Sequence, residues 1–346
     1  MKKYNIALVG MGCIGKVHAY SIASLPYFYS NCGFTAVPHT LVTSKQNSFG
    51  FLNVTDNFDD VLNNPEIDIV DICTPNTCHY AQAKAALNAG KHVFCEKPLA
   101  VTSQEAEELA DIAKKNGLVT GLNFQNRYWA GVIKAKELIA SIGEIITFRA
   151  AFLHSSSLDK DKPYAWRYAP VSEGGGVIND LGSHVFDILY YLIGNFEDIK
   201  CMTKTLHTER SGKEITSDDA AFMAVKMQCG AVGTVEATKL ATGISDSLRF
   251  EIHGTGGALR FDTQEPNTLW YFDGESYRAI DVMQKYPAPC DFQNAKNNTG
   301  GLRAHIHAYF EFVNAVHTGN SFYPDFKDGA YIQRVIEKAY LEGEKK

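Results

Sequence analysis

A glycine-rich turn near the first residue restricts the fold of this chain more than any other stretch. Residues 4–9 form a short apolar run, and residues 16–25 have a helical pattern. Between them the chain reads Gly10-Met11-Gly12-Cys13-Ile14-Gly15. Glycines at this spacing between a strand and a helix permit a tight turn, close approach to a pyrophosphate, and close packing of the helix on the strand. The stretch therefore predicts a dinucleotide-binding turn, and a purely structural turn is the alternative.

Strand and helix patterns alternate through the rest of the first third of the chain. The predicted strands are 67–73, 92–95 and 118–121, and the predicted helices are 56–62, 79–89 and 103–116. In the last of these helices, Ser103 is the expected N-cap and Gly117 the expected stop. Such alternation predicts a parallel sheet with helices on both faces.

The second strand is expected late, at 39–42, after an aromatic connection. It ends in Thr43-Ser44-Lys45 and lacks the acidic residue that holds the ribose hydroxyls of NAD. Hydroxyls and a lysine suit the 2′-phosphate of NADP instead. Ser44 and Lys45 therefore favour NADP over NAD, and a solvated loop end is the alternative.

The later part of the chain has the pattern of an antiparallel sheet. The predicted strands are 145–153, 200–207, 219–228, 232–240, 248–254 and 258–262. Helices are expected at 131–141, 303–316 and 328–342, and a loop at 286–301. The segment 254–257, reading GTGG, predicts a hairpin connection.

The 346 residues suggest about two domains in an α/β protein. We predict an N-terminal Rossmann dinucleotide-binding domain at 1–122. The C-terminal domain, 123–346, is expected to be α+β with a large, mostly antiparallel open sheet. Its last helix is able to pack back on the first domain.

Composition narrows the classes of function. Charged residues make up 21% of the chain and the net charge is −6, so no basic surface for nucleic acid is expected. No run approaches the roughly 20 apolar residues of a membrane span, and the apolar run 6–9 is too short for a secretion signal. Eight scattered cysteines predict free thiols, a cytoplasmic location and no metal site.

A second glycine run precedes a helical pattern in the middle of the chain. Residues 174–187 read GGGVINDLGSHVFD, with Asp180, His184 and Asp187 at spacings of four and three. At about 100° per residue these side chains share one face of a helix. Two carboxylates and an imidazole facing one direction are candidates for a site. A capped helix with a buried histidine is the alternative.

Several motifs in order link this chain to a known family. They are the turn at 10–15, Thr74-Pro75-Asn76 with His79, Gly90-Lys91-His92-Val93, Cys95-Glu96-Lys97-Pro98-Leu99, Trp166-Arg167, the helix with Asp180 and His184, and the segment 324–330. With these residues the chain resembles the Gfo/Idh/MocA oxidoreductases, which include inositol dehydrogenases, glucose–fructose oxidoreductase and related sugar dehydrogenases.

The resemblance implies that Lys97 lies beside the nicotinamide and the substrate hydroxyl, with Asp180 and His184 completing a catalytic site. Oxidation of a secondary alcohol needs a hydride acceptor and a group of suitable pKa that removes the hydroxyl proton. Histidine needs little adjustment for this role, whereas lysine needs burial or a nearby cation. Our hypothesis is that His184 is the base and Lys97 polarises the hydroxyl. The reverse assignment stays open.

The resemblance also implies further contacts. The expected cofactor contacts are Gly10, Gly12, Cys13, Ile14, Gly15, Ser44, Lys45, Thr74, Pro75, Asn76, His79, Glu96, Lys97, Trp166 and Arg167. The substrate contacts are Lys97, Asn123, Arg127, Tyr128, His154, Asp180 and His184. Arg127 is equally well explained by an interdomain salt bridge. A homodimer or homotetramer formed through the C-terminal sheet is expected.

Three classes of function compete. The first is an NAD(P)-dependent dehydrogenase acting on a secondary hydroxyl of a sugar, cyclic polyol or sugar derivative. The second is a redox-neutral enzyme that cleaves a glycosidic bond with a tightly held cofactor. The third is a sensor that binds NAD(P) without catalysis, which has no need of Lys97, Asp180 and His184 together. We favour the dehydrogenase.

Overall fold

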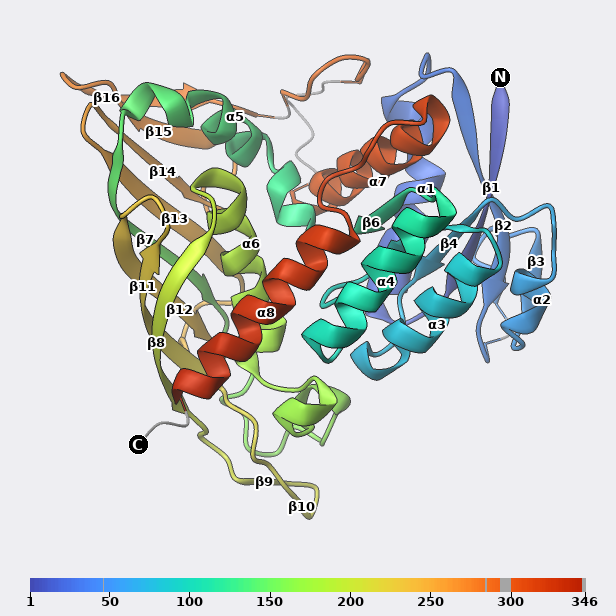
Figure 1. Ribbon diagram of the computed structural model, residues 1–346, viewed down its shortest axis with the longest axis horizontal. Coiled ribbons are helices and arrows are strands. Elements are labelled where there is room, and N and C mark those ends of the chain that lie inside the picture. The colour runs from blue at the N-terminus through green and yellow to red at the C-terminus, as the bar shows by residue number, and fades with distance from the viewer. Residues whose placement is uncertain (46, 284, 293–299, 344–346) are drawn as a thin grey trace. The chain divides into compact units, whose positions relative to one another are not determined.

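The computed structural model describes residues 1–346 except 46, 284, 293–299 and 344–346 (Figure 1). The chain divides into two compact units, Met1–Tyr128 with Gln284–Tyr331, and Trp129–Met283 with Ile332–Lys346. Each unit therefore combines two separate ranges of the chain, and the expected domain division at residue 122 stays a prediction. The predicted loop 286–301 lies partly outside the described residues.

The first unit is built on a six-stranded parallel sheet, as the alternating patterns predict. Its order is β3-β2-β1-β4-β5-β6, that of a Rossmann fold. The strands are β1 (Lys2–Val9), β2 (Phe34–Val42), β3 (Asn53–Thr55), β4 (Ile69–Ile72), β5 (His92–Cys95) and β6 (Thr120–Leu122). The edge strand β3 was not predicted, because three residues carry too little periodicity.

Helices cover both faces of this sheet (Figure 1). They are α1 (Cys13–Phe28), α2 (Asp59–Leu62), α3 (Asn76–Asn88), α4 (Ser103–Asn116) and α7 (Gly301–Thr318), with a 3-10 turn at Gln125–Tyr128. The predicted N-cap of α4 was wrong by one residue. Thr102 is the N-cap, and it forms a capping box with Glu105.

Aromatic stacking explains why α7 belongs to the first unit. The aromatic segment after residue 25, predicted as a connection, continues α1 to Phe28. The ring of Tyr29 stacks on that of Phe310 in α7, with centroids 3.8 Å apart. Such a contact between residues 281 positions apart has no local sequence signal.

The second unit is built on an eight-stranded sheet of order β16-β15-β14-β13-β7-β12-β11-β8. Its strands are β7 (Ile145–Leu153), β8 (Phe196–Lys204), β11 (Ala220–Met227), β12 (Val232–Thr238), β13 (Ser247–Gly254), β14 (Ala258–Asp262), β15 (Thr268–Phe272) and β16 (Tyr277–Asp281). Only the β7–β12 pair is parallel among these strands, so the mostly antiparallel prediction is confirmed. A small ribbon, β9 (Glu209–Arg210) and β10 (Lys213–Glu214), lies outside it.

One face of this sheet packs on helices α5 (Ala130–Leu138) and α6 (Ser183–Leu192) (Figure 1). Residues that point toward these helices, such as Phe148, Val235 and Phe250, are buried, and several of those between them, such as Arg149 and Arg249, are exposed. The last helix, α8 (Phe326–Gly343), begins in the first unit and ends in the second. Within the described part of the chain, no helix has the length and apolar character needed to cross a membrane.

Candidate active site

The three glycines of the turn after β1 have three different surroundings. Gly10 has a φ of +95°, and a Cβ there would lie 2.8 Å from the carbonyl oxygen of Cys73. A Cβ on Gly15 would collide with the carbonyl oxygen of Gly10. A Cβ on Gly12 would meet nothing within 4 Å. Gly10 and Gly15 are thus needed for packing, and Gly12 leaves open the space in front of α1.

That open space suits the pyrophosphate of a dinucleotide. Helix α1 begins at Cys13, and its first backbone N–H groups, including that of Ile14, have no acceptor within the helix. They form the partially positive end of the helix dipole. The residues present therefore fit a dinucleotide cofactor.

Two further loops share this edge of the sheet. Because β1, β4 and β5 are parallel neighbours, the segments 74–76 and 96–98 leave the sheet on the same side as the glycine turn. His79 is buried, with its ring nitrogens 2.9 Å from the carbonyl oxygen of Thr74 and 2.8 Å from that of Pro98. Burial lowers the pKa of His79, and its two contacts with carbonyl oxygens oppose that effect. His79 ties the two loops together, and its contact with the cofactor stays a prediction, as do those of Pro75 and Asn76.

Lys97 lies two residues after the end of β5, and its bond to Pro98 is cis. The backbone N–H of Lys97 donates to Glu96 Oε2 at 3.2 Å. Glu96 itself is buried, and its Oε1 lies 3.0 Å from His18 Nε2. Burial alone would raise the pKa of Glu96, but hydrogen bonding and charge from His18, with help from Asn123 and Lys97, lower it to about 2. Glu96 is therefore a buried carboxylate that holds the backbone of Lys97.

His18 is a site residue that the sequence analysis missed. Its Nδ1 lies 2.9 Å from Asp71 Oδ1 and its Nε2 faces Glu96. Burial would lower the pKa of His18, but the charge of Asp71 and the hydrogen bond that Asp71 accepts from the ring raise it well above the ordinary value. The available signal was Asp71 itself, an acid inside the apolar run 67–73.

His18, Asp71 and Cys73 also place three possible metal ligands within 4.8 Å of one another. An imidazolium has no free lone pair for a metal, because both ring nitrogens carry protons. The two nitrogens of His18 face carboxylates on opposite sides. We therefore describe this group as hydrogen-bonded rather than as a metal centre.

The segment after β6 contributes three predicted substrate contacts, and each has a partner within the first unit. The amide of Asn123 donates to Glu96 Oε1 at 2.5 Å. Arg127 Nη1 lies 3.5 Å from Asp328 Oδ2, and both residues belong to the first unit. The hydroxyl of Tyr128 donates to a backbone carbonyl at 2.7 Å. Their contacts with substrate stay predictions.

The end of β2 lies beside the glycine turn. The ammonium of Lys45 donates to the carbonyl oxygen of Met11 at 2.6 Å, and the backbone N–H of Lys45 donates to Thr43 Oγ1 at 3.2 Å. A positive charge therefore stands next to the dinucleotide turn. Ser44, which precedes Lys45, is exposed.

In the second unit, the glycine run allows the backbone to pass against a buried carboxyl group. Gly176 has a φ of +95°, and a Cβ there would collide with the carboxyl of Asp218 and lie 2.5 Å from the hydroxyl of Tyr340. Asp218 accepts hydrogen bonds from the N–H of Ile178 at 3.2 Å and from Tyr340 at 2.8 Å. Asp218 thereby fixes the start of the helical segment that carries Asp180.

The predicted helix beginning at Asp180 needs a correction. Ile178–Gly182 form a π-helix, and the α-helix α6 begins at Ser183. A π turn holds one more residue than an α turn, so the 100° spacing does not relate Asp180 to His184. Asp187 is completely buried in α6. Single π turns are frequent at functional sites, which agrees with the role expected of Asp180.

Two cations flank the carboxylate of Asp180. Lys239 Nζ lies 3.1 Å from Asp180 Oδ2, and Arg167 Nε lies 3.6 Å from the same oxygen. The side chain of Lys239 is 6% exposed, whereas that of Arg167 is 50% exposed and stacks on Trp166. Lys239 was missed by the sequence analysis, although it lies next to the end of the predicted strand 232–240 and directly follows β12 in the structure.

Phe152, near the end of β7, lies between two histidines. Its ring centroid is 4.9 Å from that of His154 and 5.6 Å from that of His184, both in edge-to-face geometry. His154 Nε2 also lies 3.2 Å from Asp246 Oδ1. Lys97 belongs to the first unit and His184 to the second, so their meeting around one substrate stays a prediction.

Comparisons with known proteins agree with this architecture. A family model described as an oxidoreductase family with an NAD-binding Rossmann fold matches residues 4–124. The model of the GFO/IDH/MocA C-terminal domain matches residues 132–260. Levoglucosan dehydrogenase of Pseudarthrobacter phenanthrenivorans is 31% identical over 383 residues, which cover 99% of this chain and 96% of that relative.

Two further matches point the same way. The 1,5-anhydro-D-fructose reductase of Ensifer adhaerens is 33% identical over 240 residues, covering 66% of this chain and 68% of the relative. A solved structure of levoglucosan dehydrogenase in complex with NADH and levoglucosan superimposes with a TM-score of 0.91 at 29% identity, covering 99% of this chain and 98% of the other. The chain belongs to the Gfo/Idh/MocA family of oxidoreductases.

Proposed function

We propose that this protein is a nicotinamide-dependent dehydrogenase that oxidises a secondary hydroxyl of a sugar, anhydrosugar or cyclic polyol, or reduces the corresponding ketone. One observation carries the proposal. Lys97 leaves the Rossmann sheet on the same edge as the dinucleotide turn, because β1, β4 and β5 are parallel neighbours. Ligands of such sheets bind at the carboxyl ends of the strands. Relatives named for levoglucosan and 1,5-anhydro-D-fructose support a carbohydrate ring as substrate.

The residues divide the chemistry between them. The cofactor supplies the hydride acceptor at the nicotinamide ring. Lys97 donates a hydrogen bond to the substrate oxygen and polarises it, and His184 accepts the hydroxyl proton as the carbonyl forms. Asp180, held by Lys239 and Arg167, accepts a hydrogen bond from a second substrate hydroxyl and orients the ring.

Replacing the two proposed proton carriers tests this division. His184→Ala is expected to lower kcat by about 100-fold or more near neutral pH, the usual range for loss of a general base. Lys97→Met is expected to lower kcat at every pH. Near wild-type turnover of His184→Ala across the pH range would rule out its role as base.

For the cofactor, we propose that the end of β2 favours NADP. Lys45 places an ammonium beside the glycine turn, and the strand end carries no acid that would repel a 2′-phosphate. The relative solved with NADH shows that a member of the family binds the unphosphorylated form. Kd values for NADP and NAD, measured by quenching of tryptophan fluorescence, test the preference.

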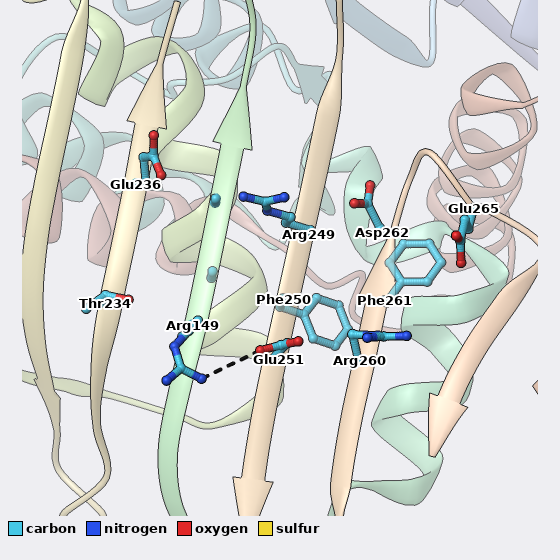
Figure 2. A pocket seen from close by; sticks show the side chains of 12 residues that line it. Arg149, Thr234, Glu236, Arg249, Phe250, Glu251, Arg260, Phe261, Asp262 and Glu265 are labelled. Atoms are coloured by element: carbon cyan, nitrogen blue, oxygen red, sulfur yellow. Dashed lines mark ion pairs between the residues drawn. The ribbon is translucent and has the colours of Figure 1, made fainter. Parts of the chain in front are cut away.

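We also propose that the open face of the large sheet joins two copies of this chain. This face holds a hollow of about 470 Å³, in which side chains of opposite charge alternate on neighbouring strands (Figure 2). Glu236 and Arg249 both stand opposite Ala151, one on each side. A two-fold axis running along β7 over Ala151 would set Glu236 of each copy against Arg249 of the other. The arrangement is thus self-complementary.

A charge swap tests this interface. Arg249→Glu is expected to produce monomers in size-exclusion chromatography with light scattering, and adding Glu236→Arg to restore the oligomer. Lys3→Glu changes the charge equally at an exposed position of the first unit and serves as control. A monomeric wild type would refute the proposal.

The free thiols support a reducing compartment. All eight cysteines are free, and three of them, Cys73, Cys95 and Cys290, are buried. We therefore propose that the protein works in the cytoplasm. Fractionation of cells that produce the protein tests this location.

A further inference from the structure

A buried chain of polar contacts connects the cofactor-binding helix α1 to the backbone of Lys97. It begins at Asp71 in β4, whose Oδ1 lies 2.9 Å from His18 Nδ1. His18 Nε2 lies 3.0 Å from Glu96 Oε1, and Glu96 Oε2 accepts the N–H of Lys97 at 3.2 Å. The exposed fractions of His18, Asp71 and Glu96 are 1%, 0% and 7%. Every step lies within the first unit.

Two buried carboxylates require a cation, and His18 is the one that touches both. The other titratable groups facing this cluster are Cys73, Cys95, His79, Lys97, His305 and Tyr309. The positive charge of Lys97 also lowers the pKa of Glu96, and burial lowers that of His79. Burial and the charge of His18 lower the pKa of His305 to about 3, so its ring stays neutral. Burial raises the pKa values of Cys73, Cys95 and Tyr309, so they are also neutral. Removal of His18 would leave the two carboxylates without their shared counter-charge.

We propose that His18 is a positioning residue for the catalytic lysine, acting as a fixed imidazolium that keeps Glu96 ionised so that Glu96 holds the backbone of Lys97. This inference rests on the dehydrogenase function proposed above. His18 contacts Glu96, and Glu96 contacts the backbone of Lys97, so His18 acts on Lys97 through Glu96. Its contribution is therefore to kcat through geometry, and a displacement of about 1 Å in such a group costs up to about 100-fold in rate.

Two variants with opposite pH responses test the proposal. In His18→Gln the side chain keeps hydrogen-bonding capacity but loses the charge, so Glu96 takes up a proton as pH falls. We expect kcat to fall on the order of tenfold to 100-fold at pH 6 and to recover toward pH 9, with the KM for cofactor changed less than about threefold. In Asp71→Asn the imidazolium loses one counter-charge and gives up its proton more readily. We expect kcat of this variant to fall as pH rises.

The double variant His18→Gln/Glu96→Gln is the matched control. It lacks the carboxylate that needs the cation, so its kcat is expected to stay low and to lose the pH dependence of His18→Gln. Wild-type kcat of His18→Gln from pH 6 to pH 9 would overturn the proposal. A loss of kcat that is equal at every pH and accompanied by a large rise in KM for cofactor would also overturn it, because that result describes only a structural defect.

A measurement without turnover separates this inference from the proposed function. With ¹⁵N-labelled lysine, the amide signal of Lys97 is identified by its loss in Lys97→Arg. We expect this signal to be constant from pH 6 to pH 9 in the wild type and to titrate in His18→Gln. Absence of titration in His18→Gln overturns the positioning role whatever the substrate is. Failure of every sugar to reduce the cofactor, with the titration observed, would refute only the dehydrogenase function.

Discussion

The ammonium of Lys239 lies 3.1 Å from Oδ2 of Asp180, and this pair joins the end of β12 to the π turn. The backbone N–H of Lys239 donates to the carbonyl oxygen of Asp219 at 2.8 Å, which fixes the base of the side chain. Arg167 approaches the same carboxylate from a half-exposed position. Lys239 is therefore the better-fixed of the two cations that orient Asp180.

Lys239→Met should remove this cation while retaining most of the volume and packing of the aliphatic part of the lysine side chain. Loss of a charged partner of a mostly buried carboxylate costs about 1–3 kcal/mol, so kcat/KM should fall about tenfold to 100-fold. Lys226→Met is the matched control, because Lys226 is exposed and pairs with Glu197 on the surface. Equal kcat/KM values for the two variants would contradict the role given to Lys239.

Gly176→Ala should reduce both stability and activity, because a Cβ at residue 176 collides with the carboxyl of Asp218. Gly230→Ala separates collision from backbone strain. Gly230 has a φ of +92°, close to that of Gly176, but its Cβ would meet nothing within 4 Å. Strain alone costs on the order of 1 kcal/mol. Urea unfolding should show a clearly larger loss of unfolding free energy for Gly176→Ala than for Gly230→Ala. Equal losses for the two variants would mean that the Asp218 side chain moves away from the added Cβ at little cost.

Lys45→Asp should change the cofactor preference toward NAD. A carboxylate at this position repels the 2′-phosphate of NADP and can accept hydrogen bonds from the ribose hydroxyls of NAD. We expect the ratio of kcat/KM for NADP to that for NAD to fall by about tenfold or more, equivalent to about 1.4 kcal/mol. Lys3→Asp makes the same charge change at the start of β1, and should leave the ratio as it is. If the ratio of kcat/KM for NADP to that for NAD did not change in Lys45→Asp, the adenosine ribose would not bind beside residue 45.

His307 should make the stability of the protein depend on pH. Burial and the charge of Arg303 lower its pKa in the folded state from 6.5 to about 3. Below pH 6.5 the unfolded chain takes up a proton that the folded chain excludes. The unfolding free energy should therefore fall as pH falls from about 6.5 toward 3, by about 1.4 kcal/mol per pH unit from this group.

His307→Gln provides the comparison for this pH effect. Glutamine can still bond the hydroxyl of Tyr29, which lies 2.7 Å from His307 Nδ1. Urea unfolding between pH 7 and pH 5 should show a shallower loss of stability for the variant than for the wild type. If the unfolding free energy depended on pH equally in the two proteins, His307 would be protonated in the folded wild type.

The sequence predicted those features that depend on local patterns. The parallel sheet, the turn at Gly10 and the helix at 103–116 follow from periodicity, glycine spacing and capping residues within a few positions of one another. Lys97 was identified through a resemblance that rests on a contiguous motif. These features reappear in the structure with their boundaries shifted by a few residues.

Features that depend on distant contacts were not predicted. His18 in α1 meets Asp71 in β4 and Glu96 after β5, and these three elements are far apart in the sequence. Lys239 meets Asp180 across 59 positions of the chain. The π turn at Ile178–Gly182 has no local pattern that separates it from an α-helix. Its geometry instead follows the packing of Gly176 against Asp218.

The central claim is that a hydride moves between a secondary carbon of a carbohydrate ring and the nicotinamide, at a site containing Lys97. The most direct measurement follows deuterium from ring-deuterated levoglucosan, inositols and aldoses to the reduced cofactor by mass spectrometry, for the wild type and for Lys97→Met with equal cofactor occupancy. We predict that at least one sugar transfers its deuterium in the wild type, and that Lys97→Met slows the transfer by about 100-fold or more. Cofactor that binds but receives no deuterium from any of these compounds would contradict the claim.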